Sequence, residues 1–77
     1  MKAIVYTEHA ARILTELNMD RNVTDDIIMT GERIREGKVK FKARRRTKHG
    51  VIVITAAEYS DHIRVITIDK VGGGRRK

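Results

Sequence analysis

An alternation of charged and apolar residues in the middle of the chain constrains the fold most strongly. Residues 38–46, KVKFKARRR, place a lysine or arginine at every second position, with Val39, Phe41 and Ala43 between them. Successive side chains of a β-strand point to opposite faces of a sheet, so this period of two predicts a strand with one cationic and one apolar face. The apolar positions match a core-facing pattern, which argues against a disordered basic tail.

Segments on either side of this strand predict the rest of a sheet. Residues 51–57, VIVITAA, are apolar on both faces and predict a central strand, and residues 62–71 predict a last strand. Short polar turns would join these strands into an antiparallel meander. Residues 3–7 predict a first strand, whereas residues 34–36 either extend the basic strand backward or form a short strand of their own.

Helical spacing occurs twice near the N-terminus. The first apolar stripe consists of Ala10, Ile13, Leu14 and Leu17. It predicts an amphipathic helix with Thr7 as its N-cap and an end at Asn18. In the second segment, Thr24 is the expected N-cap, Val23 and Ile28 would form a hydrophobic staple, and Gly31 would end the helix.

These elements predict an α+β fold in which two N-terminal helices pack on a twisted antiparallel sheet of three to four strands. We expect one domain at residues 1–71 and a flexible basic tail at residues 72–77, GGGRRK. The chain has no cysteine, which excludes disulfides and thiolate zinc sites. No apolar run approaches the ~20 residues of a membrane helix, and the N-terminus does not resemble a secretory signal. We therefore expect a cytoplasmic protein that does not enter a membrane.

Charge is distributed unevenly along the chain. The formal net charge is +7, but residues 1–37 hold five Lys/Arg and seven Asp/Glu, whereas residues 38–77 hold twelve and three. This asymmetry indicates an anionic partner, such as a nucleic acid or an acidic protein. Neighbouring cations on one strand face would repel by only about 0.6 kcal/mol in water, so the row can exist without a ligand and could serve only to prevent edge aggregation. No acid falls between Glu36 and Glu58, which favours a polyanion.

The expected contacts are with the phosphate backbone of RNA or another nucleic acid, because Phe41 is assigned to the core and Tyr6 and Tyr59 are isolated in the sequence. The predicted nucleic-acid-binding residues are Lys38, Lys40, Lys42, Arg44, Arg46, Lys48, Arg64, Arg75 and Arg76.

Three sequence segments follow in order along the chain: YTEHAARIL, then RNVTDDIIMTGERI, then basic strands ending in IRVITI. Together they resemble a family of small uncharacterised domains grouped with the RelE/BrnT-like toxins of toxin-antitoxin systems, whose first helix begins with His-Ala-x-x-Arg. His9, Ala10 and Arg12 stand in the place of this motif, although only Ala11 separates Ala10 from Arg12 here. The resemblance covers most of residues 4–69. It implies two helices on a twisted antiparallel sheet, metal-independent cleavage of messenger RNA, and neutralisation by an antitoxin protein.

Metal-free RNA cleavage needs proton-transferring groups and cations for the developing phosphorane charge. The candidate catalytic residues are His9, Arg12, His49 and Arg46. His9 fits equally well as a hydrogen-bonding residue that holds the fold. No cofactor is expected, and the spacing of the three histidines does not indicate a metal site. Three functions therefore stay open: a toxin-like ribonuclease, a non-enzymatic nucleic-acid-binding module, and a protein-interaction module that docks an acidic antitoxin-like partner or a second copy of the chain.

Overall fold

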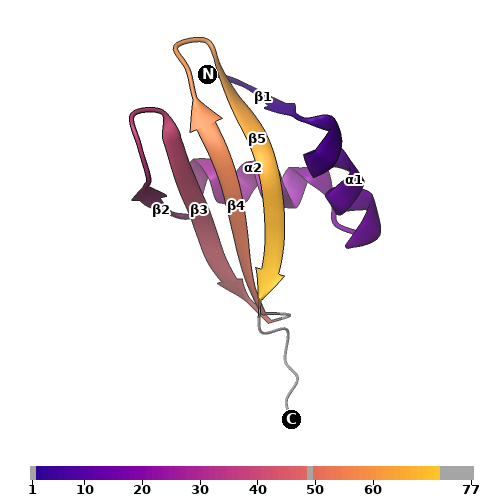
Figure 1. Ribbon diagram of the computed structural model, residues 1–77. Helices are drawn as coiled ribbons and strands as arrows, with labels where there is room; N and C mark the ends of the chain where they lie inside the picture. Colours follow the sequence, from indigo (N-terminus) through magenta and orange to yellow (C-terminus); the bar gives the residue numbers. More distant parts are fainter. Residues whose placement is uncertain (1, 49, 72–77) are drawn as a thin grey trace.

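The computed structural model describes residues 2–48 and 50–71 (Figure 1), so His49 and the predicted tail at residues 72–77 lie outside the described residues. The described chain forms five strands and two helices. In chain order these are β1 (Ala3–Tyr6), α1 (Glu8–Glu16), α2 (Arg21–Thr30), β2 (Glu32–Arg35), β3 (Lys40–Thr47), β4 (Gly50–Glu58) and β5 (His62–Val71).

The sheet has the strand order β1-β5-β4-β3-β2. Strands β2 to β5 form an antiparallel meander, whereas β1 lies parallel to β5, with Ala3 opposite His62. The predicted fold class is therefore wrong in two respects: the sheet has five strands rather than three to four, and it is mixed rather than antiparallel. Residues 32–35 form a separate edge strand. A period of two identifies a strand but contains no information about its neighbour or its direction, which is why the parallel pairing of β1 was missed.

The basic strand alternates as predicted. In β3, Phe41 and Ala43 are buried, whereas Lys40 and Arg44 are exposed. The strand begins two residues later than expected, at Lys40, because the preceding residues form the turn from β2. Strand β4 lies between β3 and β5, which confirms the predicted central strand.

Local signals place the first helix and both helix ends correctly. Thr7 is the N-cap of α1 and accepts a hydrogen bond from the backbone N–H of Ala10 at 3.1 Å. Asn18 follows the helix with a φ of 54°, in the left-handed region that asparagine tolerates. Gly31 ends α2 where the chain passes close to β3, since a Cβ at this position would lie 2.8 Å from the carbonyl oxygen of Arg44.

The start of α2 differs from the prediction. Its N-cap is Asp20, whose carboxylate accepts from the backbone N–H of Asn22 at 2.9 Å. Thr24 is fully buried within the helix and donates to the carbonyl oxygen of Arg21 at 2.8 Å. The predicted staple is wrong as well, because Val23 lies inside the helix rather than before its cap.

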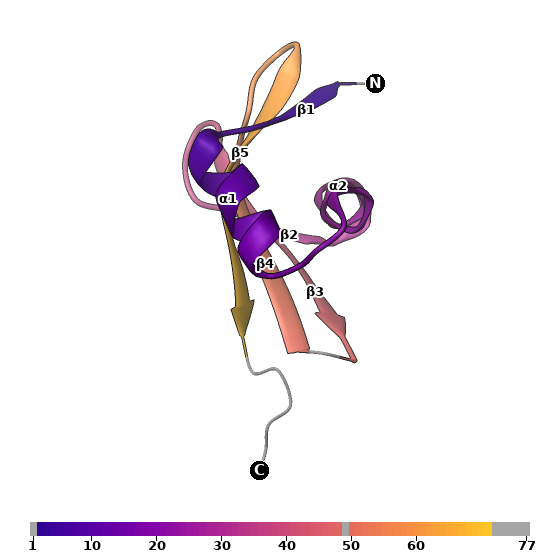
Figure 2. The same ribbon diagram turned by 90° about the vertical axis from the view of Figure 1, so that its right-hand side faces the viewer.

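One face of the sheet forms the core. Ile27 and Ile28 of α2 and Ala10 of α1 pack with buried residues of β3, β4 and β5. In Figure 2, α2 stands to one side of the sheet and α1 lies beside β5. Neither helix of the described chain covers the opposite face, which we call the open face. Lys40 and Arg44 lie on this face, because they are exposed and alternate along β3 with the buried Phe41 and Ala43.

Candidate nucleic-acid interface

The open face carries a row of cations along β3. Lys40, Lys42, Arg44 and Arg46 alternate with the residues that face the helices, so they share this face at about 6.8 Å intervals over about 20 Å. We call these four residues the cationic row. Arg64 of β5 extends the charge sideways, because both Arg64 and Lys40 lie opposite Ala57 of the central strand.

Acids from β2 partly balance the row. Glu32 lies opposite Arg44 and accepts from its Nε at 2.7 Å, and Glu36 lies 3.6 Å from the Nζ of Lys42. The absence of acids between Glu36 and Glu58 in the sequence did not predict these pairs, because they form across neighbouring strands and not along the chain. Exposed pairs of this kind contribute at most about 1 kcal/mol, so a phosphate can compete for either cation.

The ends of the row are less balanced. Within residues 2–48 and 50–71, no carboxylate forms an ion pair with Lys40, Arg46 or Arg64. Arg45 is not part of this surface: it points to the helix side and pairs with Asp26 of α2 at 2.5 Å. The three consecutive arginines therefore have two roles. Arg44 and Arg46 face solvent on the open face, whereas Arg45 links the sheet to α2.

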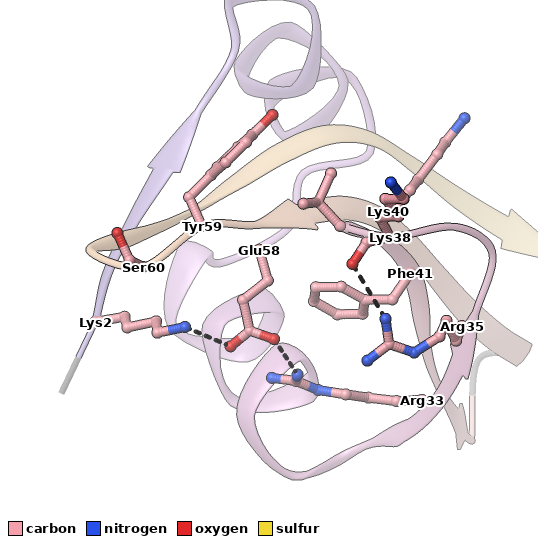
Figure 3. Close-up of a pocket in the computed structure, with 10 residues that line it drawn as sticks. Lys2, Arg33, Arg35, Lys38, Lys40, Phe41, Glu58, Tyr59 and Ser60 are labelled. Atoms are coloured by element: carbon pink, nitrogen blue, oxygen red, sulfur yellow. Dashed lines mark hydrogen bonds and ion pairs between the residues drawn. The ribbon is translucent and has the colours of Figure 1, made fainter.

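A hollow of about 510 Å³ lies at the end of the sheet where the row begins (Figure 3). We call it the end hollow. The cations that line it come from the residue before β1, from β2, from β3 and from the turn between β2 and β3: Lys2, Arg33, Arg35, Lys38 and Lys40. Glu58 is its one acidic lining residue within the described chain. The hollow therefore has a strongly positive potential, and Lys40 belongs both to it and to the cationic row.

Glu58, the last residue of β4, has a structural role in this hollow. Lys2 donates to one carboxylate oxygen at 3.0 Å and Arg33 donates to the other at 3.1 Å (Figure 3). The hydrogen bond from Lys2 lowers the pKa of Glu58, and the charges of Lys2 and Arg33 act in the same direction. Arg33 also donates to the carbonyl oxygen of Ile28 and lies 4.4 Å over the Phe41 ring, so it anchors the end of α2 to the sheet.

Arg35, Lys38 and Lys40 complete the hollow in different ways. Arg35 donates to the carbonyl oxygens of Gly37 and Lys38, at 3.2 and 3.1 Å, and so closes the turn between β2 and β3. Lys38 and Lys40 are exposed and form no ion pair with a described carboxylate. These two ammonium groups are the ones available to an incoming anion.

The rings of Tyr59 and His62, which lie three positions apart in the sequence, meet beside the end hollow. The rings of Tyr59 and His62 stack with centroids 4.9 Å apart and an interplanar angle of 26°. His62 Nδ1 lies 2.8 Å from Asp61 Oδ1, and this hydrogen bond lowers the pKa of Asp61. Sequence reasoning missed the stacked pair; the only available signal was an aromatic residue three positions from a histidine across a turn.

Of the candidate catalytic residues that the structure describes, His9 and Arg46 lie far apart. His9 Nε2 lies 3.4 Å from the hydroxyl of Thr67 on β5. Thr67 is opposite Thr55, Thr55 is opposite Lys42, and Arg46 is four residues farther along β3. With strands about 4.8 Å apart and a rise of about 3.4 Å per residue, the Cα atoms of Thr67 and Arg46 are separated by ~17 Å.

The other predicted site residues have simpler positions. Arg12 is exposed on α1, and Lys48 is exposed in the turn after β3. His49, Arg75 and Arg76 lie outside the described residues.

Among the residues that the structure describes, no group of three or more His, Cys, Asp or Glu side chains could hold a metal ion. Neither described helix is long and apolar enough to cross a membrane.

Comparisons of the chain with models of known protein families, with curated proteins and with solved structures return no match.

Proposed function

We propose that this chain binds RNA or another nucleic acid through the phosphate backbone, along the cationic row and into the end hollow. The observation that supports the proposal is the continuity of charge from Lys38 through Lys40 to Arg46 on a sheet face without a covering helix. Phosphate contacts of this kind bind with little sequence preference and release counterions.

The salt dependence of binding tests this proposal. If Lys38, Lys40, Arg46 and Arg64 neutralise four phosphates of a single strand, log K falls with log salt with a slope of about −3. Removing two of these contacts with Lys40→Ala and Arg46→Ala makes the dependence on salt less steep, with a slope of about −1.4. At 0.1 M salt it weakens binding roughly 25-fold, because each contact then contributes a factor of about 5. Fluorescence anisotropy with a labelled RNA oligonucleotide measures both quantities.

A matched control removes two exposed cations away from the open face. Arg12→Ala with Lys70→Ala makes the same change in net charge, from α1 and from the side of β5 that faces the helices, where Lys70 lies opposite the buried Ile52. This double variant is expected to bind RNA within about twofold of the unmodified chain. A flat salt slope, or equal losses in the two double variants, would contradict the proposal.

A protein partner is the second candidate, either an acidic antitoxin-like protein or a second copy of the chain, because the open face also exposes apolar side chains. Val5, Ile34 and Val71 are each more than two-fifths exposed, and all lie on this face by their strand register. Apolar groups among cations suit a protein interface with a charged rim. Analytical sedimentation at increasing protein concentration distinguishes one form of this candidate, a second copy of the chain, from nucleic-acid binding by the monomer.

A further inference from the structure

The Tyr59–His62 stack is exposed and held in place. Tyr59 is 38% exposed and is not part of the core cluster. Its backbone N–H donates to the carbonyl oxygen of His62 at 2.8 Å, which fixes the two rings across the turn between β4 and β5. The contact with Asp61 restrains the imidazole from the other side. The ring pair is therefore ordered before any ligand arrives.

Tyr59 of this stack lines the end hollow (Figure 3). Val39 and Phe41 supply apolar lining. Val39 is held to β4, because the backbone N–H of Glu58 donates to its carbonyl oxygen at 2.8 Å. At about 510 Å³ the hollow falls within the usual range of small-molecule sites, about 300 to 1,000 Å³.

The composition of these walls matches one kind of ligand group. An aromatic ring and apolar side chains suit a flat, weakly polar group, and the ammonium groups of Lys38 and Lys40 at the rim suit the anions attached to it. A simple phosphate site would need only the cations. A site for an acidic peptide would leave the exposed face of Tyr59 without a partner, because carboxylates do not stack.

We infer that the end hollow takes one unpaired nucleobase, which stacks on Tyr59 while its flanking phosphates contact Lys38 and Lys40. The inference rests on the proposed function and deepens it, because it selects single strands as the ligand. Bases of a duplex are stacked on each other and cannot enter a hollow without being extruded. The cationic row then guides the rest of the strand along β3.

Binding to three probes tests the inference: a single-stranded RNA oligonucleotide, the same sugar-phosphate strand with abasic sites, and the corresponding duplex. Tyr59→Ala is expected to weaken binding of the base-containing single strand roughly 5- to 150-fold. It should leave binding of the abasic strand and of the duplex unchanged. Tyr59→Phe keeps the ring and should keep the affinity for all three probes. Lys40→Ala should weaken binding of the abasic and the base-containing strand alike.

A second measurement uses the unmodified chain and so does not depend on how a variant folds. A strand with a single 2-aminopurine between abasic sites loses fluorescence when that base stacks on an aromatic ring. Quenching on binding supports the inference, and unchanged fluorescence at saturation overturns it. Equal affinity of Tyr59→Ala and the unmodified chain for the base-containing strand also overturns it, while the effect of Lys40→Ala would still support the proposed function. If the unmodified chain binds no probe, both fail.

Discussion

At the scale of single residues, Tyr6 shows how one side chain joins β1 to α2. Its hydroxyl donates to Asp25 Oδ1 at 2.6 Å and lies 2.5 Å from the hydroxyl of Thr24. Arg21 lies 4.7 Å over the ring and also donates to the carbonyl oxygen of Ile4. Burial, followed by the hydrogen bond to Asp25, raises the pKa of Tyr6 to about 12. In the sequence the same residue is an isolated aromatic in a short strand.

This raised pKa predicts a dependence of stability on alkaline pH. Because the folded pKa lies above the unfolded value of about 10, the contribution of Tyr6 to stability is complete below pH 10 and is lost as the pH rises through about 12. The chain has two tyrosines, so phenolate absorbance of the Tyr59→Phe variant isolates Tyr6. We expect a midpoint near 12 for the folded variant and near 10 in urea. A midpoint near 10 in both states would show that Tyr6 is not buried against Asp25.

At the scale of elements, the start of α2 offers a direct comparison between Asp20 and Thr24. Asp20→Ala removes the N-cap and is expected to lower the free energy of unfolding by about 1 kcal/mol, measured by urea denaturation. Asp20→Asn keeps an acceptor for the N–H of Asn22 and should recover most of that loss. If Asp20→Ala leaves the free energy of unfolding unchanged, Asp20 is not the N-cap, and the helix would begin at Thr24 as the sequence alone suggested.

The elements also show which parts of the structure the sequence can predict. Thr7, Asn18 and Gly31 were identified correctly because caps depend on a few neighbouring residues, and the two faces of β3 followed from its period of two. The pairing of Arg44 with Glu32 depends on strand register across twelve positions. The stack of Tyr59 on His62 depends on the shape of one turn. No spacing rule contains that information, so the partners of the cationic row and the wall of the end hollow appeared only in three dimensions.

At the scale of the whole molecule, acids and cations are separated between layers. Residues 7–31, which contain both helices, hold five acids and two cations, whereas residues 32–71 of the meander hold five acids and eleven cations. From this excess the open face receives the cationic row and Arg64. Such a charge distribution orients an approaching polyanion toward the open face before any contact forms.

The same whole-molecule arrangement predicts that His9 and Arg46 do not act together on one phosphodiester. A proton-accepting group must come within about 2.6 to 3.2 Å of the reacting hydroxyl, but His9 lies at Thr67, ~17 Å along the sheet from Arg46, and strand side chains stand roughly perpendicular to the sheet. One phosphodiester therefore cannot contact both residues. If labelled RNA is cleaved during incubation with the chain, with or without chelator, His9→Ala and Arg46→Ala should not both abolish the fragments on a denaturing gel. Fragments that disappear with His9→Ala and with Arg46→Ala, but persist with Lys70→Ala, would instead show that these two residues act together on RNA, as the RelE/BrnT resemblance implies.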